Sequence, residues 1–219
     1  MTLKLVIGNK NYSSWSMRPW LAMRASRIPF EEVFIPLYTD DKADKDRILS
    51  FSRSGKVPSL VDGDVTVWDS LAIIEYLAER FPDARLWPAD RAARAHARSI
   101  SAEMHSGFLP LRNECGMNLH RPIGAVALSA DAEANVACVQ EIWSECRERY
   151  SRKGPYLFGA FTGADAMYAP VVHRFRTYAI KVSPVVRAYM ETMLALPAVA
   201  EWTRAGLAET LVIEKFETV

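Results

Sequence analysis

The segment DSLAIIEYLAERF, residues 69–81, predicts a helix in which the apolar residues Leu71, Ile74 and Ala78 recur at helical spacing. Ser70 stands where a side chain can cap the helix start, and free N–H groups there can hold a carboxylate. Asp69 adds a negative charge that suits an ammonium group. A ligand end that carries both charges, such as the end of an α-amino acid, would satisfy the pair. Simple capping by one of the two residues is the alternative.

The sequence before this helix predicts strands around a first helix. Residues 3–7 alternate with period 2 and predict a strand, and residues 32–35 form a second β-rich run. Residues 58–61 and 65–68 flank Asp62-Gly63 and predict a hairpin. A helix is expected over about 16–26, and residues 40–51 form a polar stretch with partial helix signals. The order of these elements predicts an α/β module with a mixed sheet.

The sequence after residue 82 changes character. Pro82 to Pro88 interrupts the pattern and predicts a linker. Helical segments follow at 92–108, 131–150, 162–179, 184–196 and 198–209. We therefore expect an α/β domain at 1–82, a linker at 83–89 and an all-helical domain at 90–219.

The composition excludes several classes of protein. Of the 219 residues 50% are hydrophobic and 24% are charged, which excludes a disordered or fibrous chain. Lys and Arg total 27 against 26 for Asp and Glu, so no overall field favours nucleic acid or an acidic membrane. No apolar run approaches the ~20 residues that cross a bilayer, and the N-terminus does not resemble a secretory signal. These observations predict a cytoplasmic protein.

The cysteines and histidines predict neither a disulfide framework nor a metal site. The chain has an odd number of cysteines and no CxxC pair, which fits a reducing compartment. The three are Cys115, Cys138 and Cys146. The four histidines are at 96, 105, 120 and 173, without the spacing of metal ligands. We expect no metal cofactor.

A hydroxyl-rich loop follows the first strand, in the stretch NYSSWSMRP at residues 11–19. Pro19 lacks an N–H, so we expect the next helix to start no earlier than about Ser16, with Ser13 in the loop before it. A hydroxyl there faces the positive end of the helix dipole, where an anion is favoured. The alternative is that these serines only cap the helix.

Two further motifs stand in the loops. Val57-Pro58 precedes the hairpin, and a cis bond there would turn the main chain of Val57 outward, where an extended peptide can pair with it. An ordinary trans proline at an edge strand is the alternative. Thr162 and Asp165 have the spacing of a reciprocal helix cap, which we interpret as structural.

Taken together, these motifs resemble those of the glutathione transferase superfamily. The family places a hydroxyl-rich loop after strand one, Val-Pro before strand three and an acidic-Ser pair before the next helix. The string at 69–77 is similar to the family's E/Q-S-x-A-I-x-x-Y-L signature. Two motifs of its helical domain also have counterparts here, the cap at 162–165 and the LPAVxxW pattern at 196–202. The resemblance covers nearly the whole chain and implies a thioredoxin-like domain followed by an all-α domain.

The resemblance also implies roles for individual residues. SSWSMR at 13–18 resembles the S-x-x-S-x-R segment of the serine-type zeta and tau classes, so Ser13 is expected to donate to the glutathione sulfur, with Ser14 and Tyr12 as alternates. Val57 is expected to pair with the cysteinyl unit and Lys56 to lie near the glycyl carboxylate. Asp69 and Ser70 are expected to hold the γ-glutamyl end of glutathione.

The chain departs from the zeta pattern at Trp15, where zeta enzymes and the cysteine-type beta class have a cysteine. This departure weakens an assignment as a maleylacetoacetate isomerase and excludes a cysteine-type mixed disulfide at this position. The usual Asn-Pro is also missing before Val57. Met104, His105 and Phe108 are expected either to line the pocket of the electrophile or to belong to the core.

The activity that the resemblance implies is transfer of glutathione, as its thiolate, to a small hydrophobic electrophile, with detoxification as one role. Glutathione-dependent isomerisation and peroxide reduction are alternatives, as is a binding or scaffold protein without turnover. The family forms homodimers, and an exposed residue such as Trp68 or Tyr76 is expected to be covered in one.

Overall fold

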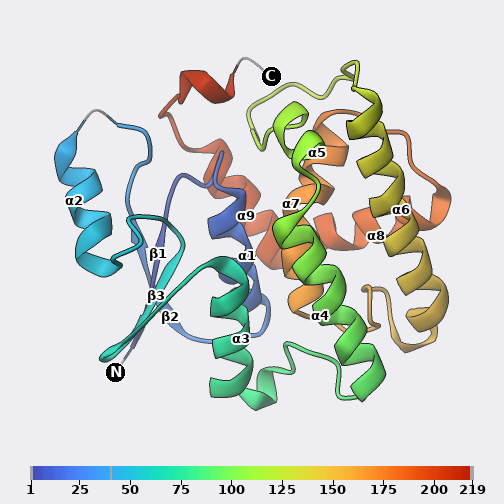
Figure 1. Cartoon of the computed structure of the whole chain (residues 1–219), viewed down its shortest axis with the longest axis horizontal. Helices are drawn as coiled ribbons and strands as arrows, with labels where there is room; N and C mark the ends of the chain where they lie inside the picture. The colour runs from blue at the N-terminus through green and yellow to red at the C-terminus, as the bar shows by residue number, and fades with distance from the viewer. Residues whose placement is uncertain (1, 40, 218–219) are drawn as a thin grey trace.

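The computed structural model describes residues 2–39 and 41–217, and Figure 1 shows a sheet with three helices beside a group of further helices. The first part has the predicted order of strands and helices. Its elements are β1 (Leu3–Ile7), α1 (Ser14–Ala25), β2 (Phe30–Phe34), α2 (Lys42–Phe51), β3 (Ser59–Asp62), β4 (Val65–Trp68) and α3 (Ser70–Arg80).

The strands form one mixed sheet in the order β2-β1-β3-β4. Strand β1 runs parallel to β2 and antiparallel to β3, with Leu5 opposite Glu32 and Leu60. Strands β3 and β4 form the expected hairpin, and Gly63 in its turn has a φ of +59°, which a glycine adopts without strain. The prediction of an α/β module with a mixed sheet is confirmed.

The alternation along β1 divides its side chains between two cores. Leu3, Leu5 and Ile7 belong to the large core beneath α1 and α3. Val6 points to the opposite face and packs in a small cluster with Ile48 of α2. Period-2 patterning therefore produces a sheet that is covered by helices on both faces.

Helix α1 corrects one expectation from the sequence. It begins at Ser14, two residues before the expected start at about Ser16, and Pro19 is its sixth residue. Pro19 leaves the carbonyl of Trp15 without its intrahelical donor, which costs stability. Packing outweighs that cost, because Met17 and Leu21 are fully buried where α1 lies against α7 and α3.

The second part of the chain is helical. The expected segments appear with shifts of at most two residues at their ends. A short helix at 109–114 had no clear sequence signal. The elements are a 3-10 turn η1 (Pro82–Ala84), α4 (Arg91–Ser106), α5 (Leu109–Glu114), α6 (Ala130–Tyr150), η2 (Ser151–Lys153), α7 (Gly163–Thr177), α8 (Pro184–Ala195), α9 (Pro197–Leu207) and η3 (Glu214–Phe216).

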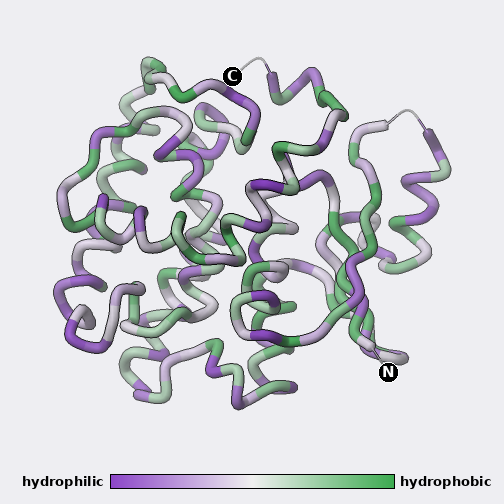
Figure 2. The backbone as a smooth tube through the Cα atoms, turned by 180° about the vertical axis from the view of Figure 1, so that it is seen from behind, coloured by the Kyte–Doolittle hydropathy of each residue, from purple (hydrophilic) through white to green (hydrophobic). Residues whose placement is uncertain are grey.

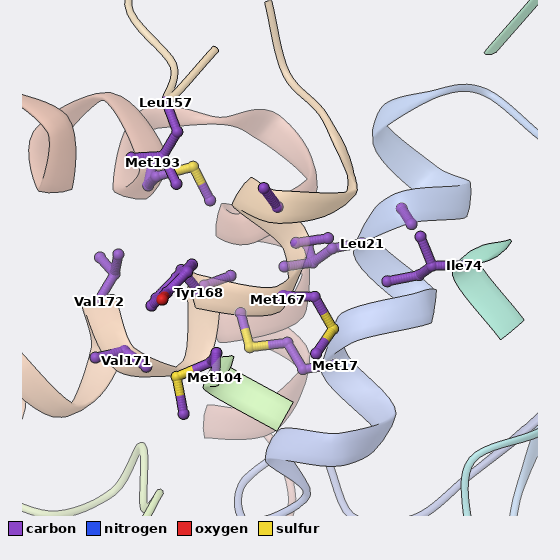
Figure 3. Packing of buried hydrophobic residues seen from close by; sticks show 14 of the residues in the cluster. Met17, Leu21, Ile74, Met104, Leu157, Met167, Tyr168, Val171, Val172 and Met193 are labelled. Carbon is purple, nitrogen blue, oxygen red and sulfur yellow. The ribbon is translucent and has the colours of Figure 1, made fainter. Parts of the chain in front are cut away.

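The two parts pack against each other through α1 and α7. Figure 3 shows Met17 and Leu21 of α1 facing Met167 of α7, with Met104 of α4 nearby. Gly163 starts α7 at close approach, because a Cβ there would lie 2.8 Å from Cγ2 of Ile74. The contacts of α7 with α1 and α3 together hold its side chains at a fixed place relative to the start of α1.

Polar and apolar residues are interspersed along the chain. Figure 2 shows hydrophobic and hydrophilic segments alternating along the chain, and no helix among the described residues is long and apolar enough to cross a membrane. Trp68 is exposed, with the guanidinium of Arg53 5.0 Å from its ring centre. Tyr76 is half-buried and donates its hydroxyl to Asp62 at 2.8 Å.

Candidate functional site

Two adjoining cavities lie at the N-terminal end of α1, with volumes of about 890 and 500 Å³. Trp15, Lys56 and Val57 line both, so the two cavities share a wall. The larger cavity also contacts Ser13, Ser14, Arg112 and Arg174, and the smaller one contacts Asp69, Ser70 and His105. The expected glutathione-binding residues are therefore brought to one place, from the α1 start, the loop before β3 and the α3 start.

The start of α3 presents polar groups to the smaller cavity. Ser70 is 1% exposed, and its hydroxyl has no hydrogen-bond partner within the described part of the chain. Asp69 has a φ of +79°, a conformation that costs energy for a residue other than glycine. A buried hydroxyl without a partner, next to a residue with a strained backbone, is typical of a binding site. This arrangement fits a ligand end that carries a carboxylate and an ammonium.

The carboxylate of Asp69 connects the two parts of the molecule. Its Oδ1 accepts from the N–H groups of Leu71 and Ala72 at 2.9 and 3.3 Å and so caps α3. Its Oδ2 lies 3.1 Å from Nε2 of His105 on α4. His105 is thus at the cavity wall next to Asp69.

The loop before β3 supplies main-chain groups. The Val57–Pro58 bond is cis. Strand β3 begins two residues later, at Ser59, so Val57 lies outside the ladder of the sheet. Lys56 is exposed and lines both cavities.

The two adjacent serines at the start of α1 have different hydrogen bonds. The hydroxyl of Ser13 accepts from the N–H of Ser16 at 3.3 Å and donates to the Ser16 hydroxyl at 2.8 Å, so Ser13 caps α1. The hydroxyl of Ser14 accepts from Nη2 of Arg174 at 3.4 Å. Both serines line the larger cavity.

Tyr12, the third candidate hydroxyl, is held by the C-terminal segment. It donates to a carboxylate oxygen of Glu217 and accepts from the N–H of Ile213 at 3.3 Å. Burial is the main cause that raises the pKa of Tyr12. Phe216 packs against the rings of Tyr12 and Tyr38, at centroid distances of 5.6 and 5.4 Å. The Tyr12 hydroxyl is therefore engaged away from the serines.

Guanidinium groups surround the start of α1. The indole of Trp15 lies between Arg18 and Arg112, whose central carbons are 4.2 and 4.6 Å from its ring centre. Burial, followed by the charges of Arg174 and Arg112, lowers the pKa of Arg18 to about 9. Burial also lowers the pKa of Arg174 to about 10.

These three guanidiniums form no salt bridge with the described part of the chain. Within residues 2–39 and 41–217, no carboxylate oxygen lies within 4.0 Å of a nitrogen of Arg18, Arg112 or Arg174. One nitrogen of Arg18, Nη1, is buried without any partner among these residues. Buried charges are normally paired, and Arg112 and Arg174 line the larger cavity, so this part of its wall is complementary to an anion.

Two of the residues considered for the electrophile pocket belong to the core. Met104 is fully buried, and Figure 3 shows it beside Met167. Phe108 is 8% exposed and packs in the same core. Neither lines the two cavities, because both side chains point into the contact between helices; only His105 of the three reaches a cavity wall.

The cysteines lie outside the site. Cys115 is fully buried, and burial raises the pKa of its thiol to about 11, which makes it a poor nucleophile. Among the described residues, no group of three or more His, Cys, Asp or Glu side chains could hold a metal ion.

Sequence reasoning did not identify Arg112, Arg174, Lys215 or Phe216 as lining residues. Arg174 lies in a helix that is otherwise apolar at most positions, and a cation on such a face was the available signal. The other three belong to no motif. The fold alone brings them to the cavity.

Comparisons with known proteins identify the class that this fold and site define. Residues 12–80 match the family model "Glutathione S-transferase, N-terminal domain", and residues 129–205 match "Glutathione S-transferase, C-terminal domain". The chain belongs to the glutathione S-transferase superfamily. The expected fold, a thioredoxin-like domain followed by an all-helical one, is confirmed.

Individual relatives refine this comparison. The chain is 40% identical over 102 residues to a probable maleylacetoacetate isomerase of Caenorhabditis elegans, a match that covers 46% of each chain. It is 30% identical to a maleylacetoacetate isomerase of Rattus norvegicus, over 84% of each chain. A glutathione transferase homolog of Burkholderia, solved with bound glutathione, is 26% identical with a TM-score of 0.69, over 95% of this chain and 100% of the other.

Proposed function

We propose that this protein binds glutathione and activates its thiol for attack on a small electrophile. The observation that carries the proposal is the buried hydroxyl of Ser70, which has no partner among the described residues, beside Asp69 with its strained backbone. Both line a cavity that adjoins the one lined by Ser13 and Ser14. A similar solved structure contains glutathione, which supports the same ligand here.

The binding residues follow from the chemistry of the tripeptide. Ser70, at the start of α3, would hold the γ-glutamyl carboxylate, and Asp69, whose Oδ1 already accepts from the N–H groups of Leu71 and Ala72, would hold the ammonium. The main chain of Val57 would pair with the cysteinyl unit, as an added strand pairs with a sheet edge. Lys56 would lie near the glycyl carboxylate. This orientation directs the sulfur toward the start of α1.

The role of the α1 serines is to stabilise the thiolate. A free thiol has a pKa of about 8.5, and lowering it by ~2 requires about 2.7 kcal/mol. One hydroxyl that donates to the charged sulfur contributes ~1.5–3 kcal/mol, and a helix start adds ~0.3–1 kcal/mol. Ser13 or Ser14 can supply this donor, whereas the Tyr12 hydroxyl already donates to Glu217.

The second substrate follows from the guanidinium wall. We favour glutathione-dependent isomerisation of an unsaturated acid over conjugation of a purely apolar electrophile. One relative is named as a maleylacetoacetate isomerase and another as a probable one. Arg112 lines the larger cavity and forms no salt bridge with the described residues, so it offers a cation to a substrate carboxylate. Addition of the thiolate to a conjugated double bond would convert it to a single bond that rotates. Elimination of the same thiolate would restore the double bond, so glutathione is not consumed.

Isothermal titration with glutathione, followed by turnover assays, tests the proposal. We expect binding and turnover of a cis-unsaturated keto diacid, with slower conjugation of a generic aromatic electrophile. An assay with an organic hydroperoxide examines the peroxidase alternative. Binding without turnover of any of these substrates would favour a binding or scaffold protein, and absence of glutathione binding would refute the proposal.

We also propose a homodimer in which the exposed face around Trp68 is covered. The family resemblance and the 38% exposure of this indole support the proposal. Light scattering should give twice the mass of the chain. A stable monomer at micromolar concentration would contradict it.

A further inference from the structure

The two adjacent serines of α1 differ in the use of their protons. A serine hydroxyl has one proton to donate and two lone pairs that accept. The Ser13 proton is used by the Ser16 hydroxyl at 2.8 Å. That Ser16 hydroxyl also accepts from the N–H of Gly8 at 3.1 Å, so the three residues form a closed local network. The hydroxyl of Ser13 is therefore used to cap α1.

Ser14 has the opposite arrangement. The nitrogens of a guanidinium carry only donors, so the bond between Arg174 Nη2 and Ser14 Oγ uses a lone pair of the serine. The proton of the Ser14 hydroxyl has no acceptor among the described residues. Ser14 is 8% exposed and lines the larger cavity, so this proton is available to a group in that cavity.

Arg174 is fixed in place by main-chain carbonyls. Its Nη1 donates to the carbonyls of Arg112 and Cys115, at the end of α5, with a distance of 3.0 Å to the first. Arg174 itself is 6% exposed and comes from α7, 160 residues after Ser14 in the sequence. A buried guanidinium with two anchored donors has little freedom, so its third contact orients the serine.

We propose that Ser14 is the hydroxyl that donates to the glutathione sulfur and that Arg174 is the residue that positions it. This inference rests on the proposed function, because it requires a thiol in the cavity. Donation from the guanidinium also polarises the serine oxygen and makes its proton a stronger donor. The uncompensated positive charge of Arg174 favours a thiolate nearby over a neutral thiol.

The two residues proposed to activate the thiol come from different parts of the molecule, the α/β part and the helical part. The α/β part supplies the hydroxyl on α1, and the helical part supplies the orienting cation on α7. The contact between α1 and α7 that buries Met17 against Met167 therefore also sets the geometry of the thiol donor.

The first experiment compares the same substitution at the two serines. The ultraviolet absorbance of the thiolate is titrated with pH for glutathione bound to wild type, Ser14→Ala and Ser13→Ala. We expect Ser14→Ala to raise the pKa of the bound thiol by about 1 to 2, the size of a lost hydrogen bond to a charged group. Ser14→Thr, which keeps a hydroxyl, should restore most of the wild-type value. Ser13→Ala should lower the midpoint of thermal unfolding and change the thiol pKa by less than ~0.5.

The second experiment removes the orienting cation. Arg174→Gln should raise the thiol pKa, whereas Arg176→Gln, at an exposed position of the same helix, should leave it unchanged. In the double variant Arg174→Gln/Ser14→Ala, the thiol pKa should rise by less than the sum of the rises in the two single variants, because Arg174 acts through Ser14. Arg174→Lys keeps the charge, loses the fixed geometry and should show a smaller rise; it replaces Arg174→Gln if that variant does not fold.

The outcomes separate this inference from the proposed function. If wild type binds no glutathione, the proposed function fails. If wild type lowers the thiol pKa but Ser13→Ala raises it while Ser14→Ala does not, only the inference fails. Additive effects of Ser14→Ala and Arg174→Gln would overturn the positioning role of Arg174 and leave Ser14 as the donor.

Discussion

Two helix starts in this molecule have similar residues and opposite chemistry. Helix α3 begins with Asp69 and Ser70, and α7 begins after Thr162 with Asp165 in its first turn. Each combines a hydroxyl with a carboxylate. The first lies at a cavity, and the second lies in the core.

At the start of α7 the polar groups are well paired. Oδ2 of Asp165 accepts from the N–H and the hydroxyl of Thr162 at 2.8 and 3.0 Å, and Oδ1 accepts from the N–H of Leu157 and the hydroxyl of Tyr189. The capping box predicted for Thr162 and Asp165 is confirmed. Burial still raises the pKa of Asp165 to about 6, since these four bonds offset only part of the desolvation.

At the start of α3 the pairing is incomplete. The hydroxyl of Ser70 has no partner in the described part of the chain, and Asp69 adopts a strained backbone conformation. A helix start that stabilises the fold uses its polar groups internally, whereas one that binds a ligand keeps them available. Paired and unpaired groups, rather than residue types, distinguish the two.

The largest expected effect is on stability at α7. Asp165→Ala leaves several buried donors without an acceptor and should lower the free energy of unfolding by about 3 kcal/mol or more. Asp131→Ala, at the exposed first turn of α6, is the control and should cost less than ~1 kcal/mol. Denaturant unfolding measures both. Equal effects would contradict the contrast between buried and exposed helix starts.

The next effect is on binding at α3. Asp69→Asn keeps a capping side chain that tolerates positive φ and loses the charge, so KM for glutathione should rise about tenfold with little change in kcat. Asp64→Asn, in the exposed turn of the hairpin, serves as the control. A large fall in kcat at unchanged KM would assign Asp69 to the chemical step instead.

Thr162→Ala should reduce the free energy of unfolding by ~0.5–2 kcal/mol, the usual cost of a lost cap. The affinity for glutathione in the folded fraction should remain at the wild-type value, because Thr162 lines neither cavity. Denaturant unfolding and titration calorimetry on the same sample check the two statements. A loss of glutathione affinity with an unchanged free energy of unfolding would contradict the interpretation of Thr162 as a structural cap.

The smallest effect is expected from Ser70→Ala. Its hydroxyl has no partner within the described residues, so its removal should change the free energy of unfolding by less than ~0.5 kcal/mol. The Kd for glutathione should rise about fivefold, the scale of one net hydrogen bond. A variant that loses stability and keeps affinity would make Ser70 a structural cap like Thr162.

Local patterns predicted most elements and the residues that meet at the smaller cavity. Alternation in β1, helical spacing in α3 and the turn at Gly63 depend on near neighbours, so the sequence indicates them directly. The start of α1 was predicted two residues late, because tertiary packing overrides the local cost of Pro19. The roles of Arg112 and Arg174 depend on contacts across the fold, which no local spacing encodes.

The C-terminal turn has a consequence for how this protein can diversify. Lys215 and Phe216 form part of the wall of the larger cavity, yet Phe216 contacts mainly the rings of Tyr12 and Tyr38 and lies outside both hydrophobic cores. Changes of side chain in this segment would therefore reshape the larger cavity without repacking either hydrophobic core. The C-terminal part of this wall and the two hydrophobic cores are therefore built from separate stretches of the chain, so the shape of the cavity can change while the cores stay the same.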